Sequence, residues 1–107
     1  MTKQEMIDKG MELAYKAAQD AFRKGLIADV SLYPENRGCK IFDDFFLTVT
    51  ASGGETVEKD GRKVWSFHHS INWSIDPWYT EEQNWNRLVE SIAEMQQVIS
   101  NYKPKED

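Results

Sequence analysis

The stretch from Trp65 to Ile75 alternates apolar and polar side chains with few interruptions. Its odd positions are Trp, Phe, His, Ile, Trp and Ile, whereas positions 66 to 74 on the even side are Ser, His, Ser, Asn and Ser. Because successive side chains of a strand point to opposite faces of a sheet, this pattern predicts a strand with one apolar and one polar face. His68 and His69 then point away from each other and cannot bind one metal ion together.

The two histidines therefore have different expected environments. His69 lies in the apolar row, where we expect a core residue whose ring nitrogens bond to a carbonyl group or water; the alternative is a buried functional group. His68 lies in the polar row, on a face that Thr48 and Thr50 of a neighbouring strand could share. This face of Ser, Thr, His and Asn is a candidate binding surface, although exposed strand positions also carry such residues simply because they are solvated.

Both ends of the chain carry helix signals. Thr2 and Glu5 have the spacing of a capping box, and Gly25 is a natural C-terminal stop. Thr80 and Gln83 form a second capping box. The helix that follows the second box has one apolar stripe, made of Trp85, Leu88, Val89, Ile92, Met95, Ile99 and Tyr102.

Two further strands are predicted between the first helix and the alternating stretch. The apolar alternation covers residues 26–33 and roughly 41–51, with a loop over residues 34–38. We expect Ser52-Gly53-Gly54 to interrupt the second strand, and Lys59-Asp60-Gly61 to close a hairpin onto the third.

The two hairpin strands must pair so that their apolar rows share a face. A two-residue Asp60-Gly61 turn would pair odd positions with even ones, yet both apolar rows are odd-numbered. One extra residue must therefore be accommodated, either in a three-residue loop with Gly61 left-handed or in a bulge at Ser52-Gly53-Gly54. The rows are Phe45, Leu47 and Val49 on the second strand and Phe67, Ile71 and Trp73 on the third.

These elements predict the α+β class, in α-β-β-β-α order. We expect a single domain over residues 1–103, with two helices packed on one face of a three-stranded antiparallel sheet, and a flexible tail over residues 104–107. The length of 107 residues suits one core. The order resembles that of double-stranded-RNA-binding domains, which place lysines at the start of the last helix. This chain has Thr80, Glu81 and Glu82 there, which would repel phosphate, so nucleic-acid binding is not expected.

Residues for catalysis or cofactor binding are sparse. The histidines diverge, the adjacent Asp43 and Asp44 diverge for the same reason, and no glycine-rich phosphate loop occurs. A metal site needs three or four converging ligands. Cys39 is the single cysteine, and a lone intracellular cysteine is usually inert. We therefore expect neither an enzyme nor a bound metal or cofactor.

The same inventory bears on the compartment. No apolar run approaches the roughly 20 residues of a membrane helix. The N-terminal MTKQEMIDKG does not have the pattern of a secretory signal, and one cysteine cannot form an intrachain disulfide. We expect a cytoplasmic protein that does not bind membranes.

Asp76-Pro77-Trp78-Tyr79 places two large aromatic residues in the connector before the last helix. The structural interpretation is that Trp78 and Tyr79 close the end of the core while Pro77 stiffens the bend. The functional interpretation is an aromatic anchor for a partner, because Trp and Tyr are enriched among binding hot spots.

The net charge is −5, and the excess acid lies towards the C-terminus, since residues 64–107 carry seven acidic and three basic side chains. In size, charge and missing catalytic residues the chain is similar to phage-encoded inhibitors of bacterial defence, including anti-CRISPR proteins. The leading hypothesis is a non-catalytic module that binds a protein partner and inhibits it by occupying a basic, nucleic-acid-binding surface. The expected contact residues are Glu81, Glu82, Glu90 and Glu94, then Asp43, Asp44, Glu55, Glu58 and Asp60, together with His68, Trp78 and Tyr79.

Two alternatives remain open. The first is a small-ligand binder or small enzyme that uses the His68 face or a pocket beneath the Asp76–Tyr79 connector. The second is a structural subunit of a larger assembly, which would need an exposed apolar patch such as Phe42 or Phe46 could supply. The sequence leaves the oligomeric state undetermined.

Overall fold

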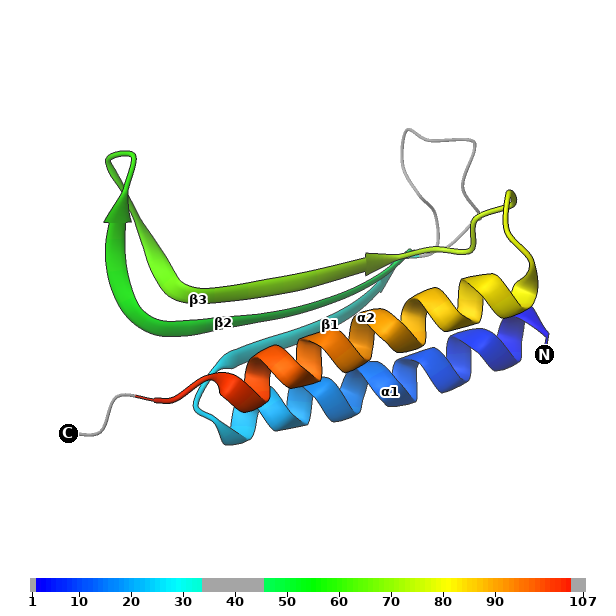
Figure 1. Ribbon diagram of the computed structural model, residues 1–107, viewed down its shortest axis with the longest axis horizontal. Coiled ribbons are helices and arrows are strands. Elements are labelled where there is room, and N and C mark those ends of the chain that lie inside the picture. Colours follow the sequence, from blue (N-terminus) through cyan, green and yellow to red (C-terminus); the bar gives the residue numbers. More distant parts are fainter. Residues whose placement is uncertain (1, 34–45, 105–107) are drawn as a thin grey trace.

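Two helices of 21 residues each lie side by side on one face of a three-stranded antiparallel sheet (Figure 1). The computed structural model describes residues 2–33 and 46–104. The chain runs through α1 (Lys3–Arg23), β1 (Ile27–Tyr33), β2 (Phe46–Lys59), β3 (Arg62–Trp73) and α2 (Glu81–Asn101). The predicted α+β class, element order and sheet are therefore confirmed.

Both helices begin at the predicted capping boxes. The hydroxyl groups of Thr2 and Thr80 each accept a hydrogen bond at 3.1 Å from the backbone amide three residues further on. Where α1 meets α2, a Cβ atom on Gly10 would lie 2.9 Å from Leu88 Cδ2, so the missing side chain is what allows this close approach. Neither helix of the described ranges is long and apolar enough to cross a membrane.

A bulge in β2 resolves the mismatch between the hairpin strands. Lys59 pairs with Arg62, so the turn has two residues, both in the left-handed region with φ of 54° and 77°. The register shifts between Gly53 and Thr56, where β2 accommodates one residue more than β3. The chain thus adopts the bulge rather than the three-residue loop. The expectation that Ser52-Gly53-Gly54 interrupts β2 was wrong, because the strand continues through the bulge to its partner at the turn.

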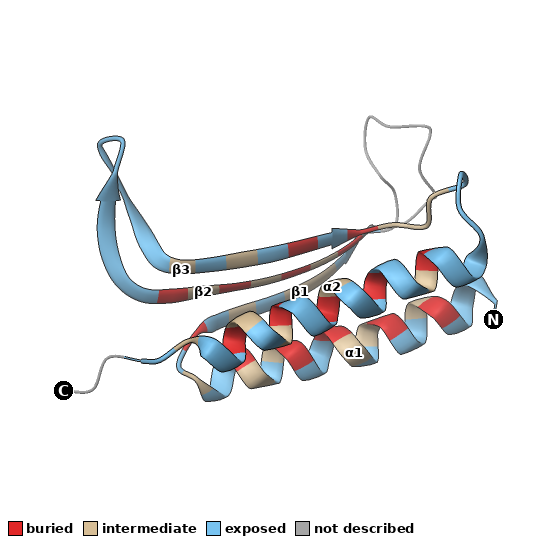
Figure 2. Cartoon of the chain, in the orientation of Figure 1, coloured by how far each residue is buried: buried red, intermediate tan, exposed pale blue. Residues whose placement is uncertain are grey.

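The core lies between the sheet and the helices (Figure 2). Asn84 is the buried polar residue of the described chain, at 1 % exposure. The buried apolar residues are Met6, Ala14, Ala17, Ala21, Leu26, Leu47, Val49, Ala51, Ile71, Trp73, Leu88, Ile92, Met95 and Ile99.

Beyond the bulge, β2 and β3 form an arm, residues 54–66, that bends away from the helices (Figure 1). Every residue of the arm is exposed. The helix layer ends near Phe67, whose ring centroid lies 5.0 Å from that of Tyr102. Trp65, which the alternation placed first in the apolar row, is consequently 46 % exposed.

Candidate functional site

The connector between β3 and α2 is fixed by the side chain of Asn84, which lies one turn into α2. Asn84 Oδ1 accepts a hydrogen bond from the Asp76 amide at 2.9 Å. Asn84 Nδ2 donates to the Asp76 carbonyl at 3.0 Å and to the Thr80 carbonyl at 3.1 Å. The Asn84 backbone carbonyl in turn accepts from Trp73 Nε1 at 3.1 Å, which links the connector to the core. A buried, fully bonded amide of this kind fixes one backbone path.

Asp76 holds the tip of the same connector. Its Oδ1 accepts a hydrogen bond from the Trp78 amide at 2.9 Å, and its carbonyl accepts from the Tyr79 amide at 3.2 Å. Its Oδ2 lies 4.0 Å from Arg87 Nη1. The Arg87 guanidinium also lies over the Tyr79 ring, 4.8 Å from the centroid, in cation–π geometry. Tyr79, at 46 % exposure, is therefore held from one side by α2.

Trp78 points away from this support into solvent. It is 80 % exposed, the largest value among the exposed large apolar residues of the described chain. The prediction that Trp78 closes the end of the core was therefore wrong. Ile75 and Trp85, on either side of it in the sequence, pack against the core instead. An exposed indole on a hydrogen-bonded turn suits a binding anchor. The backbone is already ordered, so little conformational entropy is lost when a partner buries the side chain.

The predicted acidic residues of α2 are all exposed, and they outweigh the basic ones. Glu82, Glu90 and Glu94 lie away from the buried stripe of the helix, and Glu81 is in the first turn, three residues after Trp78 in the sequence. Arg87, the one basic residue of α2, is engaged with Asp76 and Tyr79. We call Glu82, Glu90 and Glu94 the α2 acidic face.

The second-choice carboxylates do not form a comparable surface. Glu55, Glu58 and Asp60 are exposed on the arm, but Lys59, Arg62 and Lys63 lie among them. Glu58 is the direct cross-strand partner of Lys63, so the arm is close to neutral in charge. Asp43 and Asp44 lie outside the described residues.

The prediction that β3 has one apolar and one polar face is confirmed. His68 is exposed and pairs with Ser52, and the same face carries the pairs Thr50 with Ser70 and Thr48 with Asn72. His69 is half-buried on the helix-facing side, where it pairs with Ala51.

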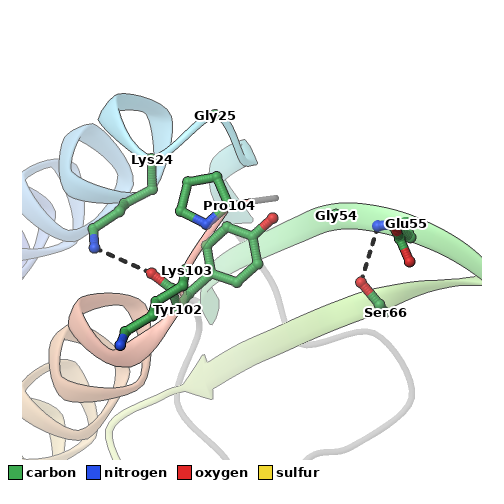
Figure 3. Close-up of a pocket in the computed structure, with 8 residues that line it drawn as sticks. All are labelled: Lys24, Gly25, Gly54, Glu55, Ser66, Tyr102, Lys103 and Pro104. Atoms are coloured by element: carbon green, nitrogen blue, oxygen red, sulfur yellow. Dashed lines mark hydrogen bonds between the residues drawn. The ribbon is translucent and has the colours of Figure 1, made fainter. Parts of the chain in front are cut away.

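A groove at the far end of the helices, of about 540 Å³, was not expected from the sequence (Figure 3). Two of its polar side chains, Lys24 and Ser66, already have structural partners. Lys24 Nζ donates to the carbonyls of Ser100 and Tyr102 at 3.3 and 3.1 Å, which satisfies the C-terminal end of α2. Ser66 Oγ accepts from the Glu55 amide at 3.0 Å and closes the bulge. The hydrogen bonds of Lys24 and Ser66 therefore serve the helix end and the bulge, and they do not point to a ligand.

Two further grooves lie between α1 and β1 and between the end of α1 and Ile99 of α2. Neither His68 nor the Asp76–Tyr79 connector lines any of these three grooves. Among residues 2–33 and 46–104, no three His, Cys, Asp or Glu side chains converge as metal ligands.

Asn84 is the site residue that sequence reasoning missed. It lies in register with the buried stripe of α2, ahead of Leu88 and Ile92, so a polar residue at a core position was the available signal.

The chain matches no protein-family model, and neither a curated protein nor a solved structure is significantly similar to it.

Proposed function

We propose that this chain is a non-catalytic, cytoplasmic module that binds another protein, with Trp78 as the anchor and the α2 acidic face as its charged surround. The observation that carries this proposal is the 80 % exposure of Trp78 on a connector fixed by Asn84 and Asp76. An indole this exposed gains apolar contact on binding, and its fixed backbone avoids the entropy cost of ordering a loop.

The partner that fits this surface is a basic protein. Four exposed carboxylates of α2 and a single engaged arginine favour approach to a surface rich in Lys and Arg. Such surfaces occur where proteins bind nucleic acid, so occupation by this chain would inhibit that binding. Inhibition of a nucleic-acid-binding protein, in the manner of the phage inhibitors of bacterial defence, is the role that we propose.

The test is affinity capture from the native cell lysate with wild-type chain, Trp78→Ala and Trp65→Ala as bait. Trp65 is the matched control, because it is also an exposed tryptophan but lies on the arm. We expect the wild-type chain and Trp65→Ala to capture a protein that Trp78→Ala does not capture. A hot-spot tryptophan contributes roughly 2 kcal/mol or more, or about 30-fold in affinity. Capture that is the same for both variants would contradict the proposal.

A second comparison tests the charge. Glu82→Gln, Glu90→Gln and Glu94→Gln combined should weaken binding at low salt and flatten its dependence on ionic strength. Glu55→Gln with Glu58→Gln, on the charge-balanced arm, is the control that should leave both unchanged. Wild-type affinity that does not fall between low and high salt would rule out the electrostatic part of the proposal.

A further inference from the structure

A second apolar surface surrounds β1, remote in sequence from Trp78. Three side chains of β1 are largely exposed, Ile27 at 57 %, Leu32 at 43 % and Tyr33 at 50 %. On the helix side of β1, Tyr15 and Phe22 of α1 are 61 % and 75 % exposed. A groove of about 610 Å³ runs between the two elements, lined by Tyr15 and Phe22 on one side and by residues 28–30 on the other. Isolated exposed apolar residues are ordinary, but exposed apolar side chains on both faces of one strand, with Tyr15 and Phe22 beside its helix-facing side, mark an interaction surface.

The outer edge of β1 also carries backbone N–H and C=O groups that could form hydrogen bonds with a further strand. The strand order is β1-β2-β3, so β1 is an edge strand, and no other strand of the described residues pairs with its outer side. The outer N–H and C=O groups of an edge strand are a template for a further strand. The seven residues of β1 include neither proline nor lysine, which commonly protect such an edge.

The side chains of β1 are complementary to a second copy of β1. Directly paired residues share a face of the sheet, so odd-numbered residues of one β1 must pair with odd-numbered residues of the other. The two-fold axis must therefore place one residue of β1 opposite the same residue of the second copy. An axis at Val30 is the one that pairs all seven residues of β1. It places Ile27 opposite Tyr33 on one face and Ala28 opposite Leu32 on the other, so each exposed apolar residue meets another apolar residue.

The charged residue supports the same register. With the axis at Val30, Asp29 lies opposite Ser31 of the second copy, and the two aspartates do not face each other. An axis one residue earlier would place Asp29 directly opposite Asp29, which is unfavourable. An axis at Ser31 would leave Ile27 unpaired.

We propose that β1 pairs antiparallel with β1 of a second copy about a two-fold axis at Val30. The two three-stranded sheets then form one continuous sheet, with the helices of both copies on the same face. Tyr15 and Phe22, which line the groove beside β1 of their own copy, would lie close to the new strand pair. Trp78 and the α2 acidic face remain free, so the dimer is independent of the function proposed above.

The test changes charge at Ser31, which this register places opposite Asp29. Sedimentation equilibrium of the full chain, from low micromolar to millimolar concentration, should give twice the chain mass of 12.5 kDa at the upper end. Ser31→Asp places two like-charged pairs across the axis and should raise the dimer Kd about tenfold. Ser31→Lys creates two opposite-charged pairs and should lower it about threefold. Asp29→Lys combined with Ser31→Asp should restore dimerisation.

Far-UV circular dichroism of each variant separates a loss of pairing from a loss of folding. A single-chain mass at every concentration would overturn the proposal, as would a dimer whose Kd is the same in both Ser31 variants. A folded monomer whose β1 instead pairs with a strand of a captured partner protein would overturn it too.

Discussion

Asn84 determines how the chain passes from β3 into α2. One buried side chain accepts from the Asp76 amide and donates to the Asp76, Tyr79 and Thr80 carbonyls. The Asn84 backbone carbonyl accepts from the Trp73 indole. The exposure of Trp78 is a consequence of this arrangement, because the bonded backbone turns the indole outward. A single amide thus connects core packing with the proposed binding anchor.

Replacing this amide should be costly. Asn84→Ala leaves the Asp76 amide without its acceptor and removes the side-chain donor to the Asp76 and Thr80 carbonyls, which keep only their backbone donors. We expect the free energy of unfolding to fall by roughly 2–3 kcal/mol. Urea unfolding followed by circular dichroism measures the change. Asn86→Ala is the control, since Asn86 is exposed on the same helix and should change stability by less than about 0.5 kcal/mol. Equal losses in the two variants would show that the connector does not depend on Asn84.

Glu5 gives a prediction in the acid range. The Thr2 backbone amide, with the Thr2 hydroxyl second, holds the pKa of the Glu5 carboxyl below its ordinary value. Because the pKa is lowered in the folded state, the carboxylate favours the folded helix at neutral pH, and this contribution disappears as the pH falls through the folded pKa. An NMR titration should therefore find Glu5 with a lowered pKa in the wild type and an ordinary one in Thr2→Pro, which removes the donating amide and hydroxyl. A lowered pKa in both would assign the shift to another cause.

At the scale of elements, the periodicity of the sequence was sufficient to predict the faces of β2 and β3 and the need for an extra residue between them. It could not show that both strands continue past the bulge, because a Ser-Gly-Gly run is typical of a strand end as well as of a bulge. Nor could it place Trp78, since the connector path depends on a side chain eight residues beyond Asp76. Local patterns predict local geometry, whereas this contact is tertiary.

Gly54 at the bulge and Gly25 after α1 form a matched pair for comparison. Gly25 and Gly54 both have φ of 83°, but a Cβ on Gly25 would have no neighbour within 4 Å, whereas one on Gly54 would meet Ser66 Oγ. Gly25→Ala should cost about 1–2 kcal/mol from the left-handed backbone alone. Gly54→Ala should cost measurably more in urea unfolding, and Ser66→Ala in the same chain should recover part of the difference. Equal costs for the two glycines would contradict the close approach of Gly54 to Ser66.

At the scale of the whole molecule, the buried and exposed surfaces are unevenly distributed. The helices cover the sheet only as far as Phe67, and the arm beyond is exposed and close to neutral. The two surfaces proposed for partners lie elsewhere, at the Trp78 connector with α2 and along the edge of β1. The proposed protein partner and the proposed second copy would therefore use separate surfaces.

Trp78 combines an exposed side chain with a hydrogen-bonded backbone, and backbone ¹⁵N relaxation tests whether that backbone is ordered before any partner is known. The amides of Asp76, Trp78 and Tyr79 should have order parameters of about 0.85, as in the middle of α2, while acrylamide quenches the Trp78 indole freely. Trp78→Phe identifies its share of the fluorescence. Order parameters below about 0.6 at these amides would contradict the proposed role of Trp78, because a mobile connector would not present a preorganised anchor.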